Sequence, residues 1–209
     1  MQKVNYQKLF EETLNQINGS GKKPTLLLHA CCAPCSSAVL EILKDFFDIT
    51  IFFYNPNISP ESEFEYRLEE LKRLLFEMGL SNIEIISPEY KSEDFEKIAK
   101  GFEKEAEGGP RCKLCYNLRL RATANAAKAG SFDFFTTTLT VSPYKNAEAL
   151  NEIGGKLADE FGIKYLYSDF KKKEGYKRSC ELSRIYNLYR QDYCGCIYSK
   201  LLKKQIQPL

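Results

Sequence analysis

The stretch Thr25–Cys35 reads TLLLHACCAPC, an apolar run followed at once by three cysteines. A short apolar run with irregular residues on either side predicts a strand at 25–29 that is buried on both faces. Apolar residues then recur at helical spacing over 36–46. The stretch therefore predicts a strand, a cysteine-bearing loop and a helix, which together form the repeating unit of a parallel sheet.

The same alternation continues along the chain. Further strands are expected at 49–54, 83–86, 132–136 and 165–167, and helices at 4–18, 60–78, 92–102, 113–128, 146–161 and, interrupted near 194–196, at 181–204. This order predicts an α/β fold, a doubly wound and mostly parallel sheet with helices on both faces. We expect a single domain over 1–209, with a sheet core at about 24–168 and a basic helical C-terminal extension at 169–209.

The composition is that of a globular protein, because hydrophobic residues make up 44% of the 209 residues. No apolar run is long enough to span a bilayer. Residues 1–18 include Glu11 and Glu12 and lack the basic start and apolar core of a signal peptide. We therefore expect a cytoplasmic protein with no membrane partner. In that reducing compartment, clustered cysteines indicate metal binding or redox chemistry.

Seven of the eight cysteines fall in three short motifs. The motifs are Cys31-Cys32-Ala33-Pro34-Cys35, Cys112-Lys113-Leu114-Cys115 and Cys194-Gly195-Cys196. Thiolates hold iron–sulfur clusters, and three motifs provide more thiolates than one tetrahedral zinc ion uses. Spacing alone still leaves open a zinc site made from two Cys-x-x-Cys pairs. The eighth cysteine, Cys180, is expected to be a small buried apolar residue.

The third motif is too tight for an ordinary structural disulfide. A bridge between Cys194 and Cys196 would close a small strained ring, which is typical of labile, catalytic disulfides. We expect this pair to act as a redox-active dithiol or to bind a second iron. His29, the only histidine, ends the first strand, where it would hydrogen-bond cluster sulfide or donate a proton. A plain core histidine is an equal alternative.

Polar segments follow several of the predicted strands. They are Asn55-Pro56-Asn57, Thr136-Thr137-Thr138 with Ser142-Pro143-Tyr144-Lys145, and Asp169-Phe170-Lys171-Lys172-Lys173. Sites in parallel sheets lie at the carboxyl ends of the strands, so these segments and the first cysteine motif are expected at one edge. There they would bind phosphate or a nucleoside; turn formation and helix capping are the alternative.

The net charge of +2 conceals an asymmetry. Residues 60–107 carry fourteen acids and seven bases, whereas 164–209 carry eleven bases and four acids. A basic segment of this kind faces nucleic acid or forms a solvated helix face.

The motifs together resemble those of the QueH-type epoxyqueuosine reductases, over about residues 24–200. The resemblance rests on His29–Cys35, Gly109–Tyr116, Phe135–Leu139 with Ser142–Lys145, Asp169–Tyr176 and Tyr189–Cys196. It implies a fold related to the adenine-nucleotide α-hydrolase group. It also implies that epoxyqueuosine in a tRNA anticodon loop loses its epoxide oxygen as water, a two-electron reduction that needs a low-potential electron donor and, in this family, no cobalamin.

The resemblance also implies roles for individual residues. Cys31, Cys32, Cys112 and Cys115 would bind a 4Fe–4S cluster, while Cys194 and Cys196 would form the redox-active disulfide pair or help to hold a second, mononuclear iron. Asp169 is the candidate carboxylate ligand of that iron and Asp192 the runner-up. Cys35 would ligate the cube or a metal beside it. Phosphate contacts to tRNA are expected from Lys171, Lys172, Lys173, Lys177 and Arg178.

Two other functions remain open from the residues alone. One is a zinc-bearing tRNA-binding or tRNA-thiolation protein without redox turnover, and the other is a non-catalytic electron carrier. Iron and acid-labile sulfide in the purified protein would exclude the zinc protein. A substrate cleft would exclude the electron carrier, which has no need of one.

Overall fold

The computed structural model describes residues 4–19 and 21–206, and within them five parallel strands form one sheet in the order β3-β2-β1-β4-β5. The strands are β1 (Thr25–His29), β2 (Asp48–Phe52), β3 (Glu84–Ile86), β4 (Phe134–Thr137) and β5 (Lys164–Tyr165). The predicted doubly wound α/β fold is thus confirmed. β1 lies at the centre, because it pairs with both β2 and β4.

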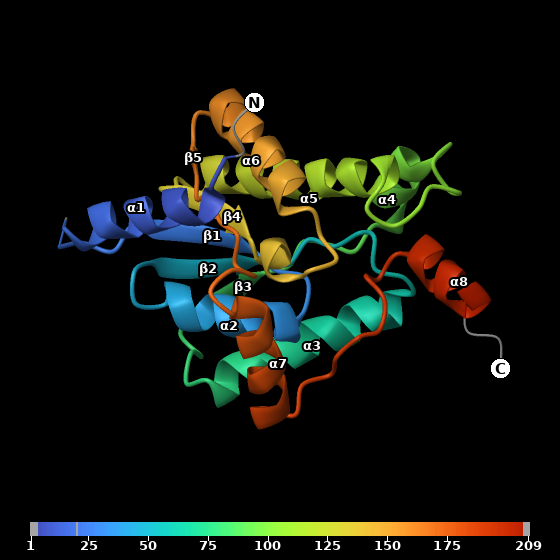
Figure 1. Ribbon diagram of the computed structural model, residues 1–209, viewed down its shortest axis with the longest axis horizontal. Helices are drawn as coiled ribbons and strands as arrows, with labels where there is room; N and C mark the ends of the chain where they lie inside the picture. The colour runs from blue at the N-terminus through green and yellow to red at the C-terminus, as the bar shows by residue number, and fades with distance from the viewer. Residues whose placement is uncertain (1–3, 20, 207–209) are drawn as a thin grey trace.

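Helices cover both faces of the sheet (Figure 1). They are α1 (Tyr6–Asn18), α2 (Ala33–Leu43), α3 (Glu61–Glu77), α4 (Ser92–Ala99), α5 (Pro110–Ala129), α6 (Ala147–Phe161), α7 (Gly175–Ile185) and α8 (Ile197–Ile206), with a 3₁₀ helix η1 (Thr138–Val141) after β4. In Figure 1, α2 and α3 lie below the sheet and α5 and α6 above it. No helix in the described residues is long and apolar enough to cross a bilayer.

The apolar run that opens β1 explains the two-sided burial. Leu26 and Leu28 belong to the core that includes α2 and α3, whereas Leu27 belongs to the core that includes α5 and α6. Successive side chains of a strand point to opposite faces, so a continuous apolar run fits a strand that is covered on both sides.

The strand register brings the expected loops to one edge. His29, the last residue of β1, is level with Phe52 of β2 and with Thr137 of β4. The chain leaves all three strands in the same direction. The first cysteine motif, the 53–60 segment and η1 therefore start side by side at the carboxyl edge of the sheet.

Two helix starts differ from the expectation. α2 begins at Ala33 instead of 36, and α5 begins at Pro110 instead of 113. Both helices carry a proline in their first turn, where the missing N–H costs nothing. Cys35 and Cys112 consequently lie inside the first turns of their helices, and Cys115 lies one turn further along α5.

The C-terminal part also differs from the expected helix at 181–204. It consists of α7 and α8, joined by an irregular segment at 186–196 that carries the third cysteine motif. α7 packs on α2, so this part of the extension lies directly on the helical layer of the sheet.

Candidate active site

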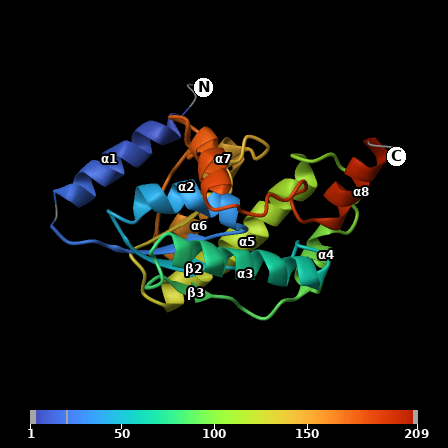
Figure 2. The ribbon, with the colours of Figure 1, turned by 90° about the horizontal axis from the view of Figure 1, so that it is seen from below.

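A cavity of about 420 Å³ opens at the carboxyl edge of the sheet. It lies where the loop after β1, the start of α5 and the 186–196 segment meet. Six cysteines from all three motifs line it, namely Cys31, Cys35, Cys112, Cys115, Cys194 and Cys196. Figure 2 shows the 186–196 segment crossing from α7 to α8, which lies near the start of α5. The three motifs, far apart in sequence, therefore form one site.

The first motif forms a compact group of thiols. The sulfurs of Cys31, Cys32 and Cys35 all lie within 4.8 Å of one another, and the Cys31 thiol donates to the Cys32 sulfur across 3.8 Å. Hydrogen bonds from Cys31 and Cys35, with the charge of Arg67, hold the pKa of Cys32 well below its usual value. Hydrogen bonds with Cys31 and Cys32, together with burial, raise the pKa of Cys35 well above its usual value. Such a group is poised to lose protons to a bound metal ion.

The second motif links the first motif to the third. Cys112 and Cys115 are separated by one turn of α5, so they share one face of the helix. Cys112 packs in the same cluster as Cys31 and Cys32, and its sulfur accepts the Gly108 N–H across 3.2 Å. Cys115 instead packs with Cys194 and Cys196.

The third motif is anchored through its backbone. Gly195 has a φ of +105°, and its carbonyl accepts the Ser59 N–H across 2.9 Å. A hydrogen bond from Cys196, together with the charge of Lys145, lowers the pKa of Cys194 to about 5, while the pKa of Cys196 is raised by the same bond. Both cysteines are free thiols in this structure. One thiolate beside one thiol is the form in which a dithiol reacts.

Helix α3 holds the segment that leads into this motif. The Glu70 carboxylate accepts the Tyr189 N–H across 2.7 Å and pairs with Arg73, which donates to the carbonyls of Tyr186 and Asn187. One turn earlier on α3, the guanidinium of the buried Arg67 lies 5.2 Å from the centre of the Tyr193 ring. α3 thus fixes the path of residues 186–193.

His29 does not line the cavity. It is completely buried; its Nδ1 lies 2.9 Å from the Thr137 hydroxyl and its Nε2 lies 3.3 Å from the Tyr54 carbonyl oxygen. Burial, with the charge of Arg119, lowers its pKa to about 4. This is the geometry of a neutral core histidine that links β1 to β4, which was the alternative expectation for His29. Both ring nitrogens are occupied, so neither is free for the expected proton donation.

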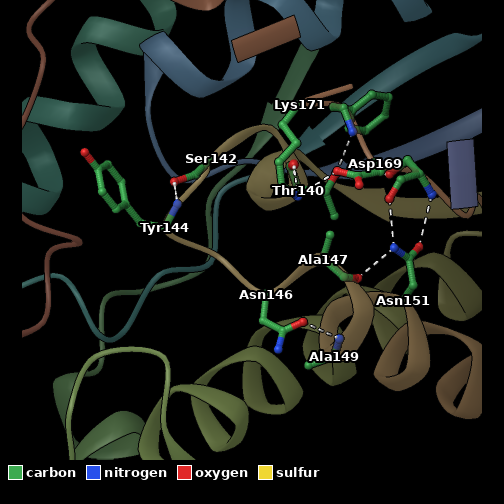
Figure 3. A network of polar contacts seen from close by, with 11 residues as sticks. Thr140, Ser142, Tyr144, Asn146, Ala147, Ala149, Asn151, Asp169 and Lys171 are labelled. Carbon is green, nitrogen blue, oxygen red and sulfur yellow. Dashed lines mark hydrogen bonds and ion pairs between the residues drawn. The ribbon is translucent and has the colours of Figure 1, made fainter. Parts of the chain in front are cut away.

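Asp169 also lies away from the cavity. Its carboxylate pairs with the Lys171 ammonium at 2.7 Å, as Figure 3 shows, and it is not among the residues of the cavity wall. Asp192, the runner-up, lies on that wall. The structure therefore brings Asp192 and not Asp169 to the cysteines.

The expected basic segment is largely paired with acids. Lys173 pairs with Glu11, Lys177 with Glu174 and Arg178 with Glu41, while Lys172 is exposed. The cavity has basic residues of its own, namely Arg111, Arg119, Lys145 and Arg190. Lys145 belongs to a polar segment that was expected at this edge, whereas the sequence reasoning gave no role to the three arginines. The positions of the three arginines, one to four residues from a cysteine motif, were a signal, because residues flanking ligands often form the second shell of a metal site.

The mouth of the cavity carries aromatic side chains. Tyr144 is 74% exposed, and in Figure 3 its ring points away from the polar network of its neighbours. Tyr176 lines the same cavity, and the Arg190 guanidinium lies 6.0 Å from the centre of its ring. Aromatic and guanidinium planes of this kind are typical surfaces for stacking a base.

A cavity lined by three cysteine motifs, at the strand-end edge of a doubly wound sheet, defines a candidate thiol-based metal or redox centre in an α/β protein. A sequence profile described as "Epoxyqueuosine reductase QueH" matches residues 26–201. The chain therefore belongs to the QueH family of epoxyqueuosine reductases, which are oxidoreductases, as the resemblance predicted.

Individual relatives match along almost the whole chain. Epoxyqueuosine reductase QueH of Staphylococcus epidermidis is 41% identical over 96% of this chain and 86% of that protein. The protein of the same name from Streptococcus pyogenes is 38% identical over 95% and 79%. That of Thermotoga maritima is 34% identical over 87% and 93%.

Proposed function

We propose that this protein reduces epoxyqueuosine to queuosine in the anticodon loop of tRNA, in the cytoplasm and without cobalamin. The observation that carries the proposal is the convergence of the three cysteine motifs on one cavity. The names of the relatives supply the substrate, and the cavity supplies thiols, cations and an aromatic mouth at which a splayed nucleotide fits.

We assign a 4Fe–4S cluster to Cys31, Cys32, Cys112 and Cys115. The donor set suits it, because iron–sulfur clusters are held by thiolates, the first-motif sulfurs already lie within 4.8 Å of one another, and Cys112 packs against them. The Gly108 N–H to Cys112 is a hydrogen bond of the kind that tunes such clusters. The chemistry that the cluster supplies when bound is one-electron transfer.

We assign the two-electron step to Cys194 and Cys196. When the epoxide is deoxygenated, both carbon–oxygen bonds break, a carbon–carbon double bond forms and the oxygen leaves as water, which consumes two electrons and two protons. Oxidation of the Cys194 thiolate and the Cys196 thiol to a disulfide releases two electrons and one proton, and the second proton is taken from water. The Lys145 charge supports this role by favouring the Cys194 thiolate. A low-potential electron donor would then restore the dithiol.

A second, mononuclear iron remains compatible with the site. Cys35 and Asp192 both line the cavity, and together they offer a thiolate and a carboxylate outside the proposed cube ligands. We therefore prefer Asp192 to Asp169 as the carboxylate ligand of this metal.

We propose that tRNA binds across the mouth of the cavity. Tyr144 and Tyr176 would stack the splayed base, and Arg190 and Lys145 would meet phosphate or ribose. Lys171, Lys172, Lys173, Lys177 and Arg178 would add contacts further along the backbone once RNA competes with their acidic partners. Such contacts make affinity fall steeply with salt.

The test is an anaerobic reaction of the iron-loaded protein with epoxyqueuosine-containing tRNA and a low-potential reductant, followed by nucleoside analysis. Wild-type protein should form queuosine. Cys194→Ser and Cys196→Ser should retain iron and sulfide but lose turnover, while Cys180→Ser, outside the three motifs, should behave as wild type. No queuosine from wild-type protein with its cluster intact would refute the proposal.

A zinc-bearing tRNA-binding or thiolation protein is the second candidate. The grouping of three first-motif thiols within 4.8 Å favours it, because a fourth ligand would complete a tetrahedral site. Metal analysis of anaerobically purified protein decides between the two: iron with acid-labile sulfide supports the reductase, and zinc without sulfide supports the alternative.

A further inference from the structure

Arg119 is a buried cation without a carboxylate partner. It lies on α5 one turn after Cys115, is 4% exposed and lines the cavity. Its Nε donates to the Cys115 carbonyl across 3.3 Å and its Nη1 to the Asn55 side-chain oxygen across 3.5 Å. Both acceptors are neutral. Among the side chains described, those of residues 4–19 and 21–201, no acid forms an ion pair with this guanidinium.

A comparison with other arginines of the protein shows that the partners of Arg119 are unusually weak. Arg67, which is also buried, pairs with Glu63 at 2.7 Å, and the half-exposed Arg121, on the same helix as Arg119, pairs with Glu160. Arg111 is buried without an acid too, but its Nη1 donates to two backbone carbonyls and its guanidinium lies over the Tyr198 ring. Among the described residues, Arg119 has only two long hydrogen bonds to offset the cost of burying its charge.

The charge of Arg119 acts on the thiols around it. Its Nε bonds to the Cys115 carbonyl, and the guanidinium lines the same cavity as Cys115 and Cys31. A buried positive charge attracts the negative charge of metal-bound thiolates. These two cysteines belong to different motifs, so Arg119 acts on both sides of the proposed cluster site.

A cluster held by four thiolates carries net negative charge, and reduction adds more. We propose that Arg119 is the fixed counter-charge of the thiolate-held metal group, and that it raises the reduction potential of that group by stabilising its reduced form. Arg119 is then a charge-balancing and positioning residue and does not touch the epoxide. The inference rests on the proposed function, because it assumes a redox-active cluster at these thiols.

The test is an equilibrium redox titration of the full-length, anaerobically reconstituted protein, followed by EPR and visible absorption. Arg119→Gln should move the midpoint to more negative potential, so that at a fixed solution potential the ratio of reduced to oxidised cluster falls about tenfold or more. Arg119→Lys should recover most of the shift. Arg121→Gln, a charge removal on the exposed side of the same helix, should leave the midpoint unchanged. Equal midpoints for wild type and Arg119→Gln would overturn the inference.

A second measurement covers the case in which Arg119→Gln loses its cluster. Cobalt(II) is titrated into the reduced, metal-free protein and its thiolate charge-transfer band is recorded. The affinity of Arg119→Gln should be about tenfold or more below that of Arg121→Gln, since the thiolate site has lost its counter-charge. Equal affinities would overturn the inference.

The two proposals fail separately. Neither titration uses tRNA, so an Arg119-dependent midpoint in a protein that forms no queuosine would refute only the proposed function. Queuosine formation by wild type, together with equal reduction midpoints for wild type and Arg119→Gln, would refute only this inference.

Discussion

Gly195→Ala is the substitution whose effect the structure defines most closely. The residue has a φ of +105°, a region that side chains with a Cβ rarely adopt. A Cβ built there would lie 2.8 Å from Ile58 Cγ1 and 3.2 Å from Arg67 Nη1. Ile58 is 0% exposed and Arg67 is 1% exposed, so neither side chain has room to move away.

The expected loss of stability has two parts. The left-handed backbone costs an alanine about 1–2 kcal/mol relative to glycine. Forcing a methyl group into a packed site adds about 1–3 kcal/mol. We therefore expect Gly195→Ala to lower the free energy of unfolding by about 2–5 kcal/mol. Gly79→Ala is the matched control, because Gly79 also has a positive φ, of +68°, but its Cβ would meet nothing within 4 Å.

The assay is urea denaturation of the reduced, metal-free protein, followed by circular dichroism. Gly79→Ala should lose only the backbone part, about 1–2 kcal/mol. Gly195→Ala should lose clearly more, and the reactivity of the Cys194 thiol should change because the segment has moved. Equal losses for the two variants would show that the contact with Ile58 and Arg67 does not constrain the third motif.

Three further substitutions test other parts of the site. Glu70→Gln should cost about 1 kcal/mol at neutral pH, because it removes a charged partner from Arg73 and Tyr189. The hydrogen bond from Arg73 lowers the pKa of Glu70 below 4.5, so the stability difference between wild type and Glu70→Gln should disappear as the pH falls through that lowered pKa. A stability difference that persists in acid would contradict the assignment. Tyr116→Phe should leave the metal-free protein as stable or up to about 1 kcal/mol more stable, because the buried hydroxyl has no partner; a loss of stability in thermal denaturation would contradict this. Asp169→Asn should retain all iron by metal analysis, and a loss of iron would restore it as a ligand.

The fold could be predicted from local patterns because these patterns report on burial. Leu26, Leu27 and Leu28 alternate between the two cores, as a strand covered on both faces requires. Helix starts were predicted less well, since Pro34 and Pro110 were interpreted as part of the preceding loops, whereas both residues fit a first helical turn.

The site could be predicted only in part. The thiol motifs were found from sequence, because cysteines at short spacing have few other uses in the reducing compartment that the sequence predicts. The roles of single polar residues were not, because each depends on partners distant in sequence. The His29 ring contacts the Thr137 hydroxyl, 108 positions away in sequence, and no sequence pattern near His29 predicts that contact.

The sequence by itself determined the parallel α/β sheet, the carboxyl edge at which the site lies and the thiol chemistry of that site. Periodicity and residue type are local properties, and they were sufficient for these features. Only the tertiary structure decided which charges meet the thiols. Asp169 pairs with Lys171 and does not line the cavity, Asp192 lies on the cavity wall, and Arg119 is buried there with no ion pair to an acid among the described residues. The physical reason is that electrostatic partners are set by distance in space, which the packing of far-apart segments creates.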